Sequence, residues 1–502
     1  MMPSQPNILL IQADQMTPFL TGAYGHPVVQ TPNLSRLVQE GVRFDAAYTP
    51  HPVCAPARAC MVTGRWVSNC EAWDNAALLR ADLPTVAHYL TNAGYDTVFA
   101  GKMHYVGPDQ LHGFRARFSA NIYPADYRWT ETMGGDGVPY NQAYTYTGDA
   151  VEIGRWPSAM AYDEEAHVRG IGYLRAQGEA RRRARKGEQQ PQPWFLFQSY
   201  HHPHELFWPP EDLWALYEDV EIDVPSFPDN LEATYSALDR WLNEYHGVEL
   251  PETLLNPESM RRVRRAYYAL VTYIDRKVGE LLATLEAEGL MNDTVIVFTS
   301  DHGDMLCEKG MVQKRTFYEW SARVPLIVRF PDGCYAGEIR QEPVNLIDLM
   351  PTFLDVAQVP DTERLEMDGR SLIGLLDGTD ADDWETFSEN HADSMVKAPC
   401  FMLRRGHYKY VYIHGYTDQL FDLAEDPGEW VNLVDDPAYA EVAQEMRERI
   451  LSAFDPDDIQ ARVDDSIRRR RVIHRAMVRN GTSWAVAPSF DPSRNSLAQY
   501  LP

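Results

Sequence analysis

The sequence predicts an α/β fold built on a largely parallel sheet. Two observations support this prediction: short apolar runs alternate with amphipathic stretches along most of the chain, and four of the apolar runs end at clusters of polar residues. Apolar runs without internal alternation are typical of strands that are buried on both faces, as in parallel sheets. The carboxyl ends of such strands are where α/β proteins usually bind ligands.

The first hundred residues supply two strands and two helices. The apolar run 7–11 predicts a buried strand, and apolar residues at helical spacing predict a helix over 32–41, with a glycine as its stop. A second helix is expected near 84–93, followed by a strand at 96–100. A polar cluster follows each of the two predicted strands.

The middle of the chain continues this pattern. Residues 194–197 and 294–298 predict two more strands, and a long amphipathic helix is expected at 260–288. The polar, proline-containing segment 177–193 indicates a surface excursion. Four strand ends should therefore deliver polar side chains to a ligand site.

Beyond residue 376 the pattern changes to short strand-like runs at 400–403 and 408–413 and a helix near 439–454. A chain of 502 residues is longer than a single hydrophobic core usually supports. We therefore expect a large catalytic domain over 1–376 and a small α+β domain with a tail over 377–502.

The chain is strongly acidic, with a formal charge of −27 from 73 acidic and 46 basic residues. This charge argues against nucleic acid or an anionic membrane as a partner, and the arginine run 468–471 is interpreted as a solvated or salt-bridged helix face. The N-terminal apolar run is too short for a signal peptide or a membrane span, so we expect a cytoplasmic protein. Six cysteines are too few for a disulfide framework.

Cys54 begins the sequence Cys-Ala-Pro-Ala-Arg, which ends at Arg58 and is followed by Thr63-Gly64-Arg65. These elements match C-x-P-x-R and T-G-R, and the chain thereby resembles the formylglycine-dependent sulfatases of the alkaline phosphatase superfamily. The resemblance implies an alkaline-phosphatase-like sheet flanked by helices. It also implies that a maturation enzyme oxidises Cys54 to formylglycine, whose hydrate is the nucleophile. A free cysteine is more commonly a small buried hydrophobic residue, and the residues below decide between the two interpretations.

Hydrolysis of a sulfate monoester requires a positively charged binding site for the anion and an activated hydroxyl group. A divalent cation activates the hydroxyl group. By resemblance, the metal ligands are Asp14, Gln15, the modified Cys54, Asp301 and His302. Hard oxygen ligands suit calcium, with magnesium or manganese as alternatives. Gln15 and His302 stand where many relatives carry aspartate and asparagine, which leaves the preferred ion open.

Five further residues resemble the basic groups of the family. Lys102 and His104 resemble the pair that contacts the sulfate and the second hydroxyl of the hydrate. His204 and Lys314 resemble the pair that holds the sulfate and assists the leaving oxygen. Arg58 resembles the residue that steadies the hydrated aldehyde. Together they would offset the negative charge of the substrate.

Within the family, long ungapped stretches such as 101–114 are most similar to choline sulfatases. That resemblance implies an aromatic wall and an acidic group around a quaternary ammonium. Trp129 is the candidate for the wall, Asn75 for a polar contact and Glu389 for the acid. His202 is a second candidate for contact with the sulfate.

The stretch 483–488 departs from the tail pattern of choline sulfatases, and 71–73 departs from their usual sequence before Asp74. Three alternative functions therefore stay open: an aryl or alkyl sulfatase, a phosphonate monoester or phosphodiester hydrolase, and a non-catalytic anion-binding relative. The expected partners are a small-molecule sulfate ester and the formylglycine-generating maturation enzyme. The family also implies a homo-oligomer, either a dimer or a tetramer.

Overall fold

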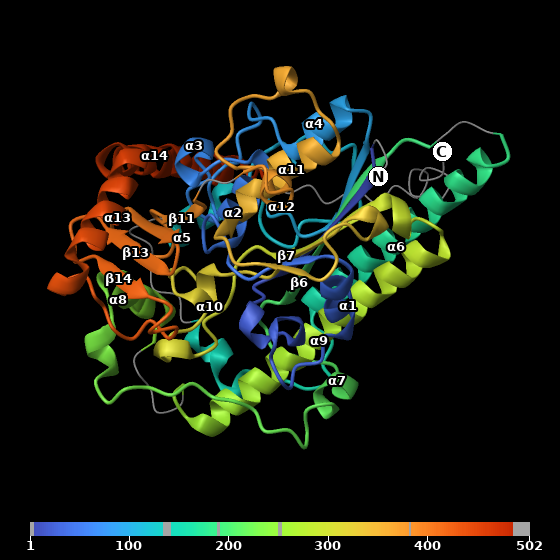
Figure 1. Ribbon diagram of the computed structural model, residues 1–502. Coiled ribbons are helices and arrows are strands. Elements are labelled where there is room, and N and C mark those ends of the chain that lie inside the picture. The colour runs from blue at the N-terminus through green and yellow to red at the C-terminus, as the bar shows by residue number, and fades with distance from the viewer. Residues whose placement is uncertain (1–4, 134–141, 188–190, 249–253, 381–382, 485–502) are drawn as a thin grey trace.

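The computed structural model describes residues 5–133, 142–187, 191–248, 254–380 and 383–484. Its main feature is an eight-stranded sheet in the order β5-β4-β6-β1-β7-β8-β2-β9 (Figure 1). In that order the strands are Ala116–Arg117, Asp96–Gly101, Trp194–Pro203, Asn7–Asp14, Thr294–Ser300, Leu326–Arg329, Val42–Phe44 and Glu338–Arg340. Only β8 runs antiparallel to its neighbours among these strands. The predicted fold class is confirmed.

The central strand β1 is buried on both faces, as its unbroken apolar run predicts. Ile8 and Leu10 belong to one core cluster, and Leu9 and Ile11 belong to the other. The first cluster is covered by α2 (Cys54–Thr63), α4 (Val86–Asn92) and α11 (Leu349–Val356). The second is covered by the long helices α6 (Ser158–Ala184) and α9 (Pro257–Ala287), which Figure 1 shows on the opposite side of the sheet.

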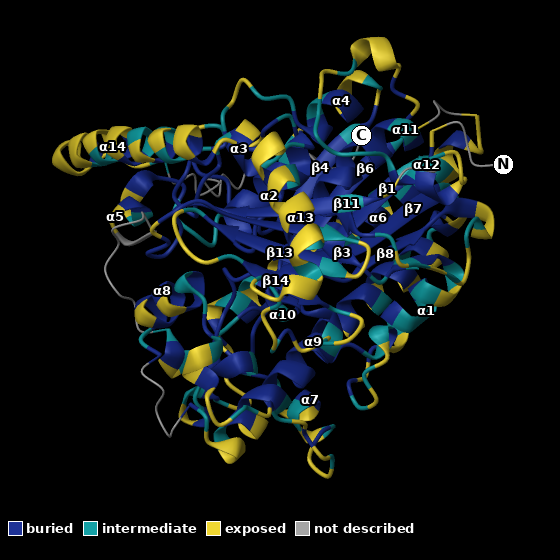
Figure 2. Ribbon diagram, turned by 60° about the vertical axis from the view of Figure 1, so that its left-hand side comes forward, coloured by how far each residue is buried: buried dark blue, intermediate teal, exposed yellow. Residues whose placement is uncertain are grey.

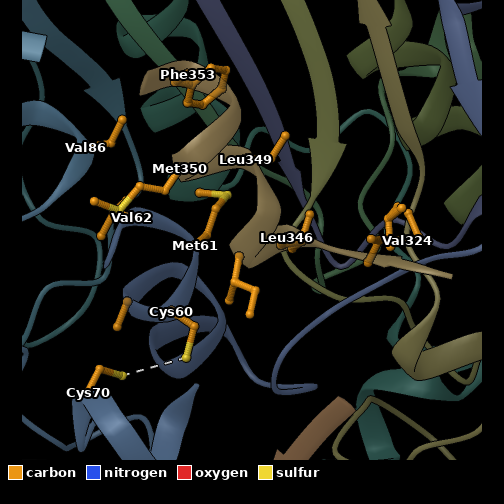
Figure 3. Close-up of a cluster of buried hydrophobic side chains, with 14 of the residues drawn as sticks. Cys60, Met61, Val62, Cys70, Val86, Val324, Leu346, Leu349, Met350 and Phe353 are labelled. Carbon is orange, nitrogen blue, oxygen red and sulfur yellow. Dashed lines mark hydrogen bonds between the residues drawn. The ribbon is translucent and has the colours of Figure 1, made fainter. Parts of the chain in front are cut away.

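Helix α2 is anchored in the first core. Met61 and Val62 are buried in a cluster that also contains Met350 and Phe353 of α11 (Figure 3). On the same helix, the Cys60 thiol lies 3.7 Å from the thiol of Cys70, which ends α3 (Val67–Cys70). These contacts hold the C-terminal half of α2 against α11 and α3.

The helices predicted at 32–41, 84–93 and 260–288 are present, the first of them as α1 (Pro32–Glu40). The segment 177–193 differs in part from its prediction, because α6 continues through it to Ala184. The polar, basic composition therefore belongs to the solvent-facing end of this helix and to the segment after it.

The C-terminal part contains an antiparallel sheet of β11 (Glu385–Asn390), β12 (Cys400–Arg405), β13 (Tyr408–Ile413) and β14 (Gln419–Asp422). Helices α13 (Ala440–Ala453) and α14 (Pro456–Asn480) follow it, and α14 exposes much of its surface (Figure 2). Phe387 and Phe401 belong to the same core cluster as α2, so this sheet packs against the main body.

Residue 376, the predicted boundary, ends α12 (Leu372–Leu376) before β11, and the division into two domains stays a prediction. The part of the predicted tail beyond residue 484 lies outside the described residues. A smaller parallel pair is formed by β3 (Ala47–Tyr48) and β10 (Val344–Asn345). Among the described helices, none carries an apolar stretch long enough to cross a bilayer.

Candidate active site

The carboxyl ends of four adjacent strands, β4, β6, β1 and β7, supply most of the predicted site. Asp14 ends β1, and Asp301 follows β7 directly. Lys102 follows β4, and His204 follows β6. Because these strands are parallel neighbours, their ends lie at one edge of the sheet. Cys54 reaches this edge as the first residue of α2.

Four predicted metal ligands form one buried cluster. The ligand atoms of Asp14, Cys54, Asp301 and His302 all lie within 4.8 Å of one another. The Cys54 sulfur is 3.1 Å from Nε2 of His302 and 3.8 Å from Oδ1 of Asp14. This sulfur stands in for the oxygens that a formylglycine hydrate would present. Two carboxylates, an imidazole and those oxygens form a donor set that fits a divalent cation.

Gln15 has a positive φ of 63° next to this cluster. Its amide nitrogen lies 2.8 Å from the Tyr146 hydroxyl, 2.6 Å from Oδ2 of Asp304 and 2.9 Å from Oε2 of Glu205. These acceptors fix the orientation of the amide, so that its oxygen accepts a hydrogen bond from Lys314. The predicted ligand role of Gln15 depends on this oxygen and stays a prediction.

Arg58 lies between the two carboxylates of the cluster. Its Nη2 is 2.8 Å from Oδ2 of Asp14, and its Nε is 2.8 Å from Oδ2 of Asp301. Lys102 adds a second cation, with Nζ 2.5 Å from Oδ2 of Asp14. All four side chains are fully buried. Buried charges of this kind need partners, and here each carboxylate has at least one.

The surrounding charges change the acidity of the cluster. Burial by itself would raise the pKa of the Cys54 thiol, but the ammonium groups of Lys102 and Lys314 outweigh it and hold that pKa well below its usual value. The pKa of Asp14 is likewise well below its ordinary range, because Lys102 opposes the effects of burial and of Cys54. Burial raises the pKa of Asp301 and outweighs the opposite effect of the Arg58 guanidinium.

A pocket of about 380 Å³ opens onto the cluster. Six predicted residues line it: Cys54, Asn75, His104, Trp129, His204 and Lys314. The structure therefore brings together the nucleophile position, both candidates for assisting the leaving group and the candidate aromatic wall.

The two leaving-group candidates are in direct contact, with Nζ of Lys314 2.8 Å from Nε2 of His204. The other ring nitrogen of His204, Nδ1, faces the backbone oxygen of Glu205 at 2.9 Å and its Oε2 at 3.1 Å. Because an ammonium group can only donate, these contacts place the imidazole proton on Nδ1. The ammonium of Lys314 then lines the pocket as a proton donor.

Two predicted substrate contacts lie outside the pocket lining. Nδ1 of His202 is 2.7 Å from Oδ2 of Asp163, which turns the ring away. Glu389 accepts hydrogen bonds from the backbone N–H of Ser68 and faces Nε2 of His391 at 2.7 Å. Both side chains are thus engaged elsewhere, and their substrate-binding roles rest on the resemblance alone.

Eight other residues of the pocket wall were not predicted from the sequence: Tyr123, Gln142, Thr145, Glu205, Leu206, Tyr245, Gln313 and Arg315. Glu205 follows His204 directly, and the last two flank Lys314, so proximity to a predicted residue was a usable signal. Tyr245 comes from α8 (Ala237–His246), whose amphipathic pattern predicts only a helix.

A site of this kind suits the hydrolysis of an ester of a sulfur or phosphorus oxyanion, because positive groups surround the position of the nucleophile. Comparison with known proteins narrows the class. The sulfatase family model matches residues 6–359, and a second model, for the C-terminal part of N-sulphoglucosamine sulphohydrolase, matches residues 307–455. The chain belongs to the sulfatase family and is a sulfuric ester hydrolase.

Individual relatives agree with this assignment. The choline-sulfatase of Rhizobium meliloti is 36% identical over 492 residues, which cover 96% of this chain and 93% of the relative. The arylsulfatase of Clostridium perfringens is 27% identical over 475 residues, covering 90% and 95%. The phosphonate monoester hydrolase of Agrobacterium radiobacter shares the fold, with a TM-score of 0.69 and 24% identity over 91% of this chain and 96% of that one.

Proposed function

We propose that this enzyme hydrolyses the sulfate monoester of a small alcohol or phenol by means of a formylglycine formed from Cys54. The observation that carries the proposal is the position of Cys54, which lines the pocket and lies within ligand distance of Asp14, Asp301 and His302. The proposal includes a divalent cation at this cluster, with calcium as the first candidate. It also makes the formylglycine-generating enzyme a partner before folding is complete.

The chain's own residues have separable tasks in this reaction. A bound divalent cation supplies Lewis acidity, and the formylglycine hydrate supplies two hydroxyl groups. Lys102 and Arg58 balance the carboxylates and favour the approach of an anion. His104 lines the pocket, where a neutral imidazole can accept a proton. Lys314, held by His204, donates the proton that the departing oxygen needs.

The pocket walls support an organic group larger than methyl. The rings of Tyr123 and Trp129 lie with their centroids 5.2 Å apart, and Trp129 lines the pocket with its ring centroid 5.7 Å from that of His104. Such a wall accepts a quaternary ammonium, as the name of the Rhizobium meliloti relative would suggest, or a flat ring. The alkyl or aryl part of the ester is therefore assigned to this side.

A phosphonate monoester or phosphodiester is the second candidate substrate. These esters carry one negative charge at the reacting centre, as sulfate monoesters do. A neutral Gln15 beside the cluster, in place of a further carboxylate, reduces repulsion of any such anion. A comparison of kcat/KM for a phosphonate ester with that for a sulfate ester ranks the two candidate substrate classes.

The test begins with the mass of the tryptic peptide 44–58 from protein made together with a maturation enzyme. Formylglycine makes this peptide about 18 daltons lighter than the thiol form. The same preparation should hydrolyse 4-nitrophenyl sulfate, lose activity with a chelator and regain it with calcium, magnesium or manganese. Cys54→Ala provides the matched control, since it removes only the modifiable thiol. An unmodified peptide from fully active protein would falsify the proposal.

A further inference from the structure

Arg315 is a buried cation of the pocket that the reaction described above does not use. It lines the pocket, and its side chain is only 2% exposed. Its Nε donates to Oδ1 of Asp393 at 2.8 Å, and its Nη1 donates to Oε1 of Gln313 at 3.3 Å. Within the described part of the chain, its Nη2 has no hydrogen-bond partner. A guanidinium held on one side presents its remaining N–H groups on the other.

The backbone of this segment is strained. Arg315 has a φ of 85° and Gln313 a φ of 66°, on either side of Lys314. Such conformations cost roughly 1–3 kcal/mol each in a residue with a side chain, and they cluster at ligand-binding positions. The Arg315 N–H donates to the backbone oxygen of Pro52 at 3.0 Å, and its oxygen accepts from Asn390 at 2.8 Å. The surrounding structure therefore imposes the direction of this side chain.

The acidic groups near the pocket are already engaged. Both oxygens of Glu205 have partners, one facing Gln313 and the other 2.9 Å from the Gln15 amide. Asp393 accepts from Arg315 through Oδ1 and from the Asn75 N–H through Oδ2 at 3.1 Å. Carboxylates with satisfied oxygens offer little to a cationic ligand, whereas Arg315 offers an unused donor.

We propose that Arg315 binds a second oxyanion, a carboxylate or a further sulfate, carried by the organic part of the ester. This inference rests on the proposed function and specifies its substrate class: an anionic ring bearing a sulfate ester. Tyr245, whose ring lies 5.6 Å from the Arg315 guanidinium carbon, and Trp129 provide flat walls for that ring. A quaternary ammonium would instead meet a buried positive charge, which disfavours choline sulfate.

The test compares 4-nitrophenyl sulfate with two ring-carboxylated nitrophenyl sulfates that differ in the position of the carboxylate, and with choline sulfate. Wild-type enzyme should prefer at least one carboxylated ester to the plain ester in kcat/KM. The decisive quantity is the ratio of kcat/KM for the carboxylated and the plain ester. Substituting Arg315→Met should lower this ratio roughly 10- to 100-fold, the effect of one charge-assisted hydrogen bond, and Arg315→Lys should restore part of it.

Two controls address folding. The double variant Arg315→Met with Asp393→Asn avoids leaving a buried carboxylate unpaired, and it should show the same lower ratio. Arg264, another buried arginine paired with a carboxylate, does not line the pocket, so Arg264→Met should keep the wild-type ratio. With wild-type enzyme alone, benzoate should inhibit hydrolysis of the plain ester more strongly than benzyltrimethylammonium.

Each failure has a distinct meaning. An unchanged ratio in Arg315→Met, or a wild-type preference for choline sulfate or benzyltrimethylammonium, overturns the role of Arg315 and leaves the proposed sulfatase mechanism standing. If wild-type protein that contains formylglycine hydrolyses no sulfate ester, both the proposed function and this inference are refuted.

Discussion

Lys314 is held by two neighbours, and this contact defines its chemical role. Its Nζ contacts the oxygen of Gln15 and lies 2.8 Å from Nε2 of His204. Both partners accept hydrogen bonds, so they keep the ammonium at the pocket edge with a donor to spare. A departing alkoxide needs this proton more than a departing nitrophenolate does, because the alkoxide is the stronger base.

Replacing Lys314 should therefore affect substrates unequally. We expect Lys314→Met to lower kcat/KM by about 10²- to 10⁴-fold for an alkyl sulfate, and by much less for 4-nitrophenyl sulfate. The measurement is kcat/KM across a series of sulfate esters whose leaving groups differ in pKa. Lys309, a buried lysine outside the pocket lining, provides the control variant Lys309→Met. Equal losses for all esters would contradict a proton-donating role.

At the scale of elements, α14 is joined to the pocket by one buried ion pair. Arg470 makes two contacts with Asp74, at 2.8 and 2.6 Å, and both side chains are almost fully buried. Asp74 precedes Asn75, whose side-chain oxygen accepts from the N–H of Ala55 in α2 at 3.0 Å. Helix α14 thereby supports the loop that borders the nucleophile.

Breaking this pair should disturb both stability and activity. Arg470→Ala leaves Asp74 as an uncompensated buried charge, which costs about 3–5 kcal/mol of unfolding free energy. We expect faster hydrogen exchange in α14 and a lower kcat/KM, with urea unfolding as the stability measurement. Arg468, whose side chain is 73% exposed, supplies the control, and Arg468→Ala should change stability by less than about 1 kcal/mol. Similar losses of stability and activity in Arg470→Ala and Arg468→Ala would contradict a specific role of the Arg470–Asp74 ion pair.

The sequence predicted the elements that depend on local periodicity and missed those that depend on distant partners. The strand β1 and the helix α9 carry clear apolar patterns, and both appear within a few residues of their predicted bounds. The interpretation of 468–471 as a salt-bridged face fits Arg469, which pairs with Asp465. Arg470 is also salt-bridged, but its partner Asp74 is 396 residues away in the sequence, and no local pattern encodes that buried contact.

The same distinction applies to the candidate site. Motifs next to strand ends indicated Asp14, Cys54 and Asp301, and these residues do converge. The far wall of the pocket depends on Tyr245 and Arg315, whose side chains meet only because α8 packs beside the segment after β7. Tertiary packing of this kind has no signature in a single sequence.

For the molecule as a whole, stability should depend on pH through Asp348. Its carboxylate accepts hydrogen bonds from the N–H groups of Asn345 and Arg370, at 2.7 and 2.8 Å, and so joins β10 to the segment before α12. Burial raises the pKa of Asp348 to about 7. An unfolded chain titrates this group near pH 4, so between the two values the folded state binds more protons. This contribution to stability is present below about pH 4 and is lost as the pH rises through 7.

The variant Asp348→Asn isolates this effect. Wild-type stability relative to the variant should fall by about 2–4 kcal/mol between pH 4 and pH 8, on top of a constant cost for the lost hydrogen bond. Urea unfolding of both proteins across this range gives the difference. Asp361→Asn serves as control, because that side chain is 94% exposed. Parallel pH profiles for wild type and Asp348→Asn would show that burial does not perturb this carboxyl group.

The burial of Cys54 has a consequence for how the protein is made. The residue is 2% exposed at the start of a helix packed into the core, so a modifying enzyme must act while this segment is still an open chain. Its partner His302 is 248 residues further along. At a synthesis rate of about 5–20 residues per second, this distance leaves roughly 12–50 seconds before the cluster can close. Under the proposed function, the fraction of active enzyme therefore depends on the rate at which Cys54 is oxidised relative to the rate at which synthesis and folding bury it. Slower synthesis should yield more active protein from the same gene.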